Sequence, residues 1–203
     1  HPNDPNTYAV LNIPNEKIAK RGVPLVNDED GYILVGSVIS DTIINTGSNV
    51  SIKSGKGDDY ILLSTGTVGG GEVITVNPAA RNVTFLASEG NDTIFGNHLG
   101  DHVYQVSVSA ASNDFVYNFG ANDVVEFLGE FTSAEDPFST SENPYTEGTT
   151  TLPDFKNLLF TCDTATLTLM KLPVGRVVNY RFNYIADGET FPVNKSITVG
   201  AGT

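Results

Sequence analysis

The chain is poor in cysteine and in positive charge. Its 203 residues include one cysteine, Cys162, and no tryptophan. A single cysteine excludes an intrachain disulfide and argues against a cysteine-based zinc site. Lysine and arginine number 11 against 24 aspartates and glutamates, so the formal net charge is −13. This balance argues against nucleic-acid binding, which needs a basic face, and against docking on an anionic membrane.

Long hydrophobic runs and helical patterns are also scarce. No stretch reaches the roughly 18 consecutive apolar residues that a membrane-spanning helix needs. Only residues 15–21 favour a short helical turn. Elsewhere, short runs of Val, Ile, Thr, Tyr and Phe are broken by Gly, Asn and Asp, which is typical of an all-β protein. With 39% apolar and 17% charged residues, the chain does not have the composition of a disordered protein.

Common catalytic signatures are missing from the sequence. It contains no HExxH zinc motif, no GxSxG nucleophile elbow and no phosphate-binding loop. His1 could hold copper only with a second converging histidine, and we expect His98 and His102 to be exposed loop residues. The acidic pair Asp58/Asp59 could suggest a glycosidase, but its position in a repeat favours ion binding. We therefore expect a protein that is not an enzyme.

The chain does contain a nine-residue repeat. Residues 45–62 align without gaps with residues 78–95, and the matched positions share glycine, aspartate and isoleucine: Gly57 with Gly90, Asp59 with Asp92, and Ile61 with Ile94. Six units carry an aspartate at the sixth position: Asp41, Asp59, Asp92, Asp101, Asp114 and Asp123. Each also has an aliphatic residue at the eighth position: Ile43, Ile61, Ile94, Val103, Val116 and Val125. Agreement at both positions in six units argues against chance.

This pattern resembles the RTX family, the hemolysin-type calcium-binding repeats of secreted bacterial proteins, with the consensus G-G-x-G-x-D-x-U-x. The nearest matches are residues 54–62, SGKGDDYIL, and residues 87–95, ASEGNDTIF. The resemblance covers residues 27–127. Most units lack one or both leading glycines, two carry Val50 or Val83 in place of aspartate, and residues 63–68 interrupt the register.

The resemblance implies a parallel β-roll in which two units form one coil, the eighth residues point inward, and turn carbonyls and sixth-position carboxylates bind calcium between stacked turns. Glycine would be needed where such turns adopt positive φ. The implied metal-site residues are Asp41, Gly55, Gly57, Asp59, Gly90, Asp92, Asp101, Asp114 and Asp123. The alternative is a calcium-free β-solenoid in which Asp and Asn only close the turns.

The sequence predicts four regions: an N-terminal arm (1–26), the calcium-binding β-roll repeats (27–127), a Ser/Thr/Pro-rich linker (128–153) and a C-terminal antiparallel region (154–203). The last contains expected strands at 164–172, 177–185 and 191–199, with a turn at 173–176 and a hairpin at Asp187-Gly188. The predicted fold is therefore all-β, with a parallel β-roll or solenoid followed by an antiparallel meander that packs on the end of the roll.

Residues 7–13, TYAVLNI, form an isolated apolar segment between Pro5 and Pro14. We expect this segment to pair with a sheet of its own chain, or to complete the sheet of a neighbouring copy as a donor strand. The sequence does not decide between the two.

Composition and resemblance together favour an exported protein, secreted to the cell surface or the extracellular space. The function they indicate is a calcium-stabilised structural or adhesive protein. Two alternatives are a non-catalytic module of a larger secreted enzyme and a self-assembling filament or surface-layer subunit. The expected partners are calcium ions, other copies of the chain or surface glycans, with no nucleic acid and no membrane span.

Overall fold

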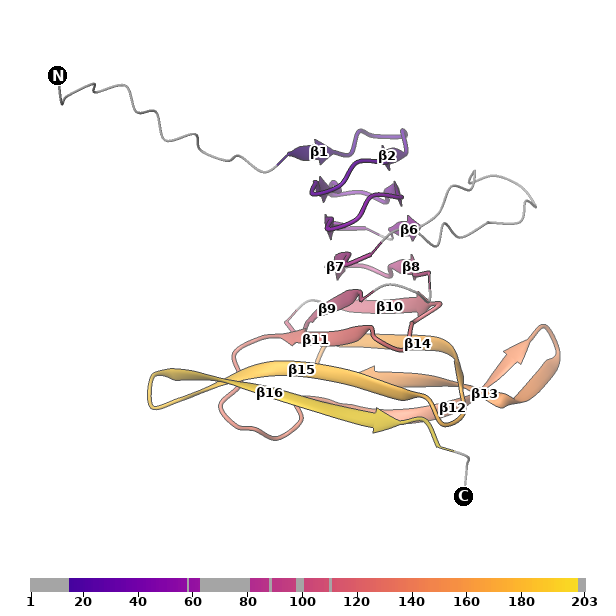
Figure 1. The fold of residues 1–203 in the computed structure, drawn as a ribbon, viewed down its shortest axis with the longest axis vertical. Helices are drawn as coiled ribbons and strands as arrows, with labels where there is room; N and C mark the ends of the chain where they lie inside the picture. The colour runs from indigo at the N-terminus through magenta and orange to yellow at the C-terminus, as the bar shows by residue number, and fades with distance from the viewer. Residues whose placement is uncertain are drawn as a thin grey trace.

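The computed structural model describes residues 15–57, 59–62, 81–87, 89–97, 101–109 and 111–200. These residues form two mixed, mostly parallel sheets of eight strands each (Figure 1). The described part of the chain has no helix, and hence none that could cross a membrane. The all-β prediction is confirmed. Residues 7–13 and 63–68, for which we predicted a strand and a register break, lie outside the described residues.

The first sheet, sheet 1, contains in spatial order β1 (Glu16–Ile18), β3 (Ile33–Val35), β5 (Ser51–Lys53), β7 (Thr84–Ala87), β9 (Val103–Ser107), β11 (Val124–Leu128), β15 (Val177–Ala186) and β16 (Glu189–Thr198). The second, sheet 2, contains β2 (Leu25–Asn27), β4 (Thr42–Asn45), β6 (Tyr60–Leu62), β8 (Thr93–Phe95), β10 (Ser112–Tyr117), β14 (Ala165–Pro173), β13 (Thr150–Thr161) and β12 (Ser139–Glu147). From β1 to β11 the chain alternates between the sheets. We call one strand of each sheet, taken together, a circuit.

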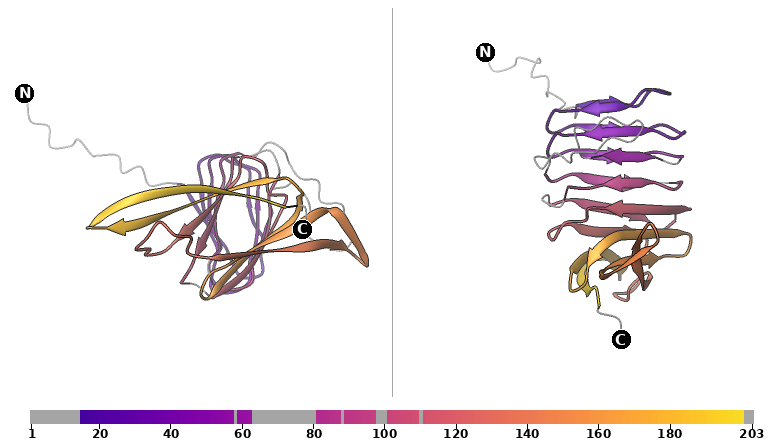
Figure 2. Two further views of the ribbon diagram at one scale, coloured as in Figure 1. Left: turned by 90° about the horizontal axis from the view of Figure 1, so that it is seen from below. Right: turned by 90° about the vertical axis from the view of Figure 1, so that its right-hand side faces the viewer.

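Successive circuits stack directly on one another (Figure 2). In sheet 2, Leu25 pairs with Ile43 and Ile43 pairs with Ile61, in parallel register. In sheet 1, Leu34 pairs with Ile52 in the same way. Because like positions of the repeat pair with each other, every circuit places an apolar side chain at the same two positions between the sheets.

The core is a double row of apolar side chains between the sheets. The inward residues of sheet 1 are Leu34, Ile52, Phe85, Tyr104 and Val125, and those of sheet 2 are Leu25, Ile43, Ile61, Ile94 and Val116; all are buried. The eighth-position prediction is therefore confirmed for five units. It is wrong for Val103, because neighbouring Tyr104 takes the inward place and pairs with Phe85.

The C-terminal strands continue both sheets. β12, β13 and β14 form an antiparallel set that joins sheet 2 through parallel pairing of β14 with β10, and the β15–β16 hairpin joins sheet 1 through β11. The three predicted strands and the Asp187-Gly188 turn are confirmed. The single meander is wrong, because β14 and β15 lie in different sheets. β14 and β15 each pack an apolar face on the existing core, β14 as part of sheet 2 and β15 as part of sheet 1. The turn after Pro173 therefore crosses from one sheet to the other.

Two further expectations are corrected. Residues 128–153 are not a plain linker, since they include β12 and the start of β13, whose side chains pair across an antiparallel ladder. The ladder has a bulge at Pro144, which an edge strand tolerates. Residues 15–21 contain strand β1 instead of a helical turn, because pairing with β3 supplies the hydrogen bonds of its backbone. The stacked strands therefore begin before residue 27.

The stacked core predicts a large cost for a cavity in its centre. Ile61 is fully buried between Ile43 and Ile94. Ile61→Ala should lower the free energy of unfolding by about 2–5 kcal/mol in chemical denaturation. Val38→Ala, at a side chain that is 76% exposed, is the matched control and should change it little. Equal effects of the two substitutions would contradict the assignment of the core.

Candidate functional site: a row of buried aspartates

Four aspartates of sheet 2 form a row inside the molecule. Each lies two residues before an inward aliphatic residue, and side chains two apart on a strand point to the same face. The row consists of Asp41, Asp59, Asp92 and Asp114, with exposed fractions of 7%, 2%, 0% and 0%. The parallel register of β4, β6, β8 and β10 stacks them one circuit apart. The repeat thus brings together four of the predicted aspartates.

Neighbouring members of this aspartate row are joined by one repeated hydrogen bond. The backbone amide of each aspartate donates to Oδ1 of the aspartate in the next circuit. The N–O distances are 2.8 Å from Asp41 to Asp59, 2.9 Å from Asp59 to Asp92 and 3.0 Å from Asp92 to Asp114. Each bond satisfies a buried donor at the point where the chain enters a strand. The carboxylates therefore hold successive circuits in register.

The second oxygens of the row have unequal surroundings. Oδ2 of Asp41 accepts from the amide of Ser37, and Oδ2 of Asp92 accepts from the Ser54 hydroxyl at 3.0 Å. Oδ2 of Asp59 and Oδ2 of Asp114 are buried and accept no hydrogen bond of good geometry, although the nearby hydroxyls of Ser54 and Ser112 lower the pKa of these carboxyls. An unsatisfied, buried carboxylate oxygen is costly, so these two positions favour an added proton or cation.

Burial changes the acidity of the same two residues. Loss of water contact raises the pKa of Asp59 to about 7, and the nearby Asp92 carboxylate raises it further, while the amide of Asp41 opposes the shift. Burial likewise raises the pKa of Asp114 to about 7, against the lowering effect of the Asp92 amide. Near neutral pH both groups therefore exchange readily between a protonated form and a carboxylate that needs a counter-charge.

Sheet 1 carries a shorter row of the same kind. Its equivalent positions are Val50, Val83, His102 and Asp123, where only the last two can accept a hydrogen bond. His102 Nδ1 accepts from the Val83 amide at 3.2 Å, and Asp123 Oδ1 accepts from the His102 amide at 2.9 Å. Burial raises the pKa of Asp123 to about 6. Because valine replaces the repeat's aspartate at positions 50 and 83, only sheet 2 has a continuous row of aspartates.

His102 is a buried structural residue, which corrects our expectation of an exposed loop position. Because Nδ1 accepts, Nε2 carries the proton and lies 2.9 Å from Oδ1 of Asn97. Burial lowers the pKa of His102 to about 4. Its alternation with the core residue Tyr104 is the signal that could have revealed its place. His98 lies outside the described residues.

Asp101 does not belong to either row. Its side chain is exposed, and His102 occupies the inward position that the repeat assigned to Asp101. The reason is a change of repeat length, since Val83 and His102 are separated by 19 residues, whereas Asp41 and Asp59 are separated by 18. One extra residue turns each following side chain to the opposite face of its strand.

The three predicted glycines shape the stacked turns beside the row. Gly55, Gly57 and Gly90 have φ values of 95°, 106° and 131°, where side chains other than glycine's are strained. A Cβ atom on Gly90 would lie 1.9 Å from the carbonyl oxygen of Gly57. Glycine is thus required both by backbone conformation and by the close approach of one turn to the next.

The donors at the row can suit a calcium ion. Asp59 Oδ2 and Asp114 Oδ2 need a positive partner, and the turns that contain Gly55, Gly57 and Gly90 pack closely on neighbouring turns. Among the described residues, no three His, Cys, Asp or Glu side chains are grouped closely enough to hold an ion. An ion here would therefore be bound by at most two carboxylates, with carbonyl oxygens completing the six to eight that calcium prefers.

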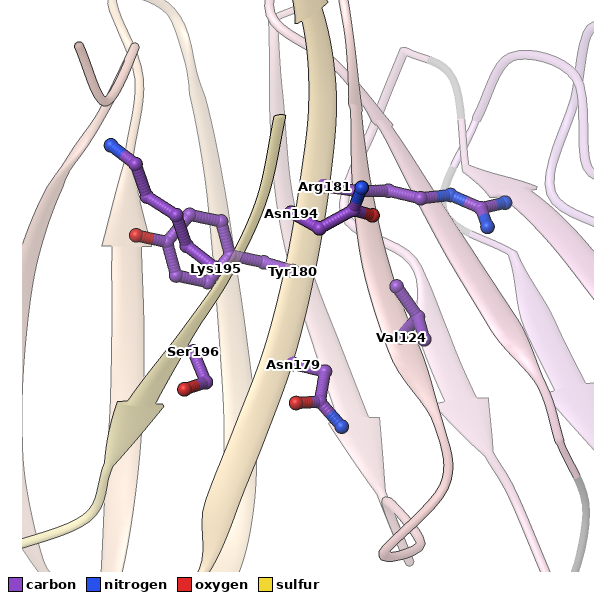
Figure 3. Close-up of a pocket in the computed structure, with 7 residues that line it drawn as sticks. All are labelled: Val124, Asn179, Tyr180, Arg181, Asn194, Lys195 and Ser196. Atoms are coloured by element: carbon purple, nitrogen blue, oxygen red, sulfur yellow. The ribbon is translucent and has the colours of Figure 1, made fainter. Parts of the chain in front are cut away.

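One surface hollow lies elsewhere and is less suited to chemistry. It has a volume of about 400 Å³ and is lined by Val124, Asn179, Tyr180, Arg181, Asn194, Lys195 and Ser196 (Figure 3). Arg181 and the two asparagines point to one side of the strands, and Tyr180 and Lys195 point to the other. Both cations are paired: Arg181 Nε is 2.8 Å from Glu126, and Lys195 Nζ is 2.7 Å from Asp136. The aspartate row is therefore the stronger candidate.

Buried asparagines and a serine also support the turns, and the repeat pattern did not identify them. Asn27 Nδ2 donates to Asn45 Oδ1 at 2.7 Å, one circuit away, and Ser54 donates to Asp92. Asn27 and Asn45 occupy like positions of consecutive circuits, so their spacing in the sequence is the signal that could have revealed them.

Comparisons of the chain with protein-family models, with curated proteins and with solved structures find no match. The functional inference therefore rests on the geometry of the aspartate row and on the sequence pattern that produces it.

The raised pKa values predict an unusual pH dependence of stability in calcium-free solution. An aspartate in an unfolded chain has a pKa of about 3.9, so between that value and about 7 the folded state binds more protons than the unfolded state. Stability should therefore fall as the pH rises through this interval. His102 acts in the opposite direction between about 4 and 6.5, but three aspartates outweigh one histidine.

Thermal melts across this pH range measure the effect. Asp59→Asn keeps an amide-accepting oxygen and removes the titration, so it should reduce the slope of melting temperature against pH. Asp163→Asn, at an exposed position outside the row, is the control and should leave the slope unchanged. The same slope in both variants would contradict the assignment of the shifted group.

Close stacking of the turns predicts different costs for two glycines that share positive φ. Gly90→Ala places Cβ against the backbone of Gly57, whereas Gly188→Ala meets no atom within 4 Å. Gly188 (φ 80°) lies nearer the left-handed helical region than Gly90 (φ 131°), so Gly90→Ala adds both greater backbone strain and the contact. Gly90→Ala should lower the melting temperature clearly more than Gly188→Ala does. Equal losses would show that the turns are not in close contact.

Proposed function

We propose that the chain is a calcium-stabilised parallel β-roll that serves as a structural or adhesive protein, secreted to the cell surface or the extracellular matrix. The observation that carries this proposal is the row of buried aspartates, two of which have an unsatisfied carboxylate oxygen. The chain already has a formal net charge of −13, so burying ionised carboxylates lowers its stability unless a cation binds beside them.

The alternation of strands between two sheets supports the β-roll. Two nine-residue units make one circuit in the regular part, where like aspartates are 18 residues apart. Inward aliphatic residues form a thin core, and glycines with positive φ place the turns on each other. These are the features that the resemblance to the RTX repeats implies.

Calcium would act as the counter-charge of the row. Neighbouring pairs of the row, Asp59 with Asp92 or Asp92 with Asp114, would hold it together with carbonyls of the glycine-containing turns. Without calcium, protons on the raised-pKa carboxyls replace it only partly at neutral pH. Because the unfolded chain has no such arrangement, the free energy of calcium binding adds to the free energy of folding. Extracellular calcium sites work at affinities of about 10⁻⁴–10⁻³ M, which suits a secreted protein.

A structural or adhesive role agrees with how the buried titratable groups are used. Asp59, Asp92 and Asp114 each accept from an amide of the neighbouring circuit, and His102 accepts from the Val83 amide. Asp41 accepts from the Ser37 amide of its own turn. Their hydrogen bonds hold backbone segments together. We therefore propose that the chain does not catalyse a reaction.

The proposal predicts a response to metal. Adding millimolar calcium to the chelated protein should raise the melting temperature and the β-sheet signal in circular dichroism, because the cation satisfies the buried carboxylates. Magnesium at the same concentration is the control, since its stricter octahedral geometry and tightly held water suit this site less. A melting curve that is the same in calcium and in chelator would overturn the proposal.

Site-directed variants locate the ion. Asp59→Ala and Asp92→Ala should each weaken calcium binding in calorimetry, whereas Asp163→Ala, outside the row, should leave it unchanged. To separate binding from folding, the titration is run on variants whose calcium-free circular dichroism matches the parent's. Equal affinities for all three variants would place the ion elsewhere.

A further inference from the structure

Among the strands that the structure describes, the two ends of the stacked sheets have no further partner. β1 and β2 are the outermost strands at one end, and β16 and β12 are the outermost strands at the other. The ends lie at opposite extremes of the molecule (Figure 1). The outer edge of such a strand offers unpaired amides and carbonyls to another chain. We call β1 and β2 with the loop between them the N-terminal end, and residues 128–147 with β16 the C-terminal end.

Exposed apolar side chains gather at both ends. Ile18, Val23 and Val26 are 61%, 59% and 58% exposed at the N-terminal end, around a hollow of about 310 Å³. Phe191 of β16 is 38% exposed at the C-terminal end, and Ile185 of neighbouring β15 is 46% exposed. Large apolar side chains left in water at an open sheet edge indicate a contact surface.

The two ends differ in the charged groups that no described partner neutralises. Residues 15–27 contain three basic residues and one acidic residue, and the exposed acidic residues Asp28, Glu29 and Asp30 follow in the next turn. Lys17 pairs with Glu29 at 3.0 Å, and Lys20 and Arg21 form no ion pair with any described residue. Residues 128–147 contain five acidic residues and no basic one. Glu142, Glu147 and Asp136 pair with lysines, which leaves Glu130 and Glu135 without a cationic partner among the described residues.

We propose that the N-terminal end of one copy binds the C-terminal end of a second copy, head to tail. Two N-terminal ends would bring the unpaired Lys20 and Arg21 of both copies together, whereas at unlike ends these cations can pair with the acidic residues 130 and 135. The strand directions also permit it: β12 runs parallel to β2 and β16 antiparallel to β1, and either direction can extend a sheet. Such a contact does not close on itself, so it generates linear assemblies. This inference does not depend on calcium.

Two variants, each blocked at one end, test the proposal. Ile18→Glu with Val26→Glu places acidic groups at the N-terminal end, where they repel the acidic C-terminal end of another copy. Phe191→Lys places a cation at the C-terminal end, where it repels the basic N-terminal end. All three side chains are exposed, so the fold should persist, and circular dichroism checks this. Val38→Glu and Val38→Lys, in a side turn with 76% exposure, are the matched controls.

The readout is sedimentation velocity over a range of protein concentrations. The full chain and both Val38 variants should form species that grow with concentration. Each blocked variant should be monomeric alone, and an equimolar mixture of the two should form a dimer that grows no further, because only one pair of intact ends remains. Assembly should weaken as salt is added.

Three results would overturn the proposal. The first is a full chain that stays monomeric at every concentration. The second is a mixture of blocked variants that forms no dimer. The third concerns residues 1–14: if their deletion converts a monomer into an assembly, the segment at 7–13 of the same chain, and not a second copy, occupies the N-terminal end.

Discussion

One hydrogen bond, repeated from circuit to circuit, is the constraint on which the rest of the structure depends. The amide of each aspartate in the row donates to the carboxylate of the aspartate in the next circuit, from Asp41 to Asp114. It fixes the register of sheet 2, because a shift by one residue would leave both amide and carboxylate buried and unpaired. The aliphatic core and the stacked glycine turns follow from that register.

The same bond creates the electrostatic demand that we propose calcium meets. Asp59, Asp92 and Asp114 use Oδ1 to hold a backbone amide, and burial leaves the second oxygen with little water. At Asp59 and Asp114 that oxygen has no hydrogen-bond partner, and the pKa of each residue is raised to about 7. A proton and a cation therefore compete for binding to the same buried carboxylates. We therefore expect the stability of the fold to depend on both pH and calcium.

The repeat predicted most of the row, because burial and hydrogen bonding both follow from nine-residue spacing. It failed where the spacing changes. One extra residue before Tyr104 exchanges Asp101 for His102, and the nine-residue repeat alone does not show where that residue is inserted. The β12–β13 hairpin was missed because its Ser- and Thr-rich strands are stabilised by cross-strand pairing, which composition does not reveal. The meander was wrong because pairing of β14 with β10 and of β15 with β11 is set by distant parts of the chain.

Site-resolved titration of the aspartate carboxyl carbons by NMR tests the central claim most directly. In chelator, we expect Asp59 and Asp114 to titrate near 7, well above the value of about 3.9 for an aspartate in an unfolded chain. In calcium, Asp59 and Asp114 should remain ionised well below that pH, because the cation replaces the proton. Ordinary titration of Asp59 and Asp114 in chelator, with no change on adding calcium, would contradict both the buried row and its proposed role.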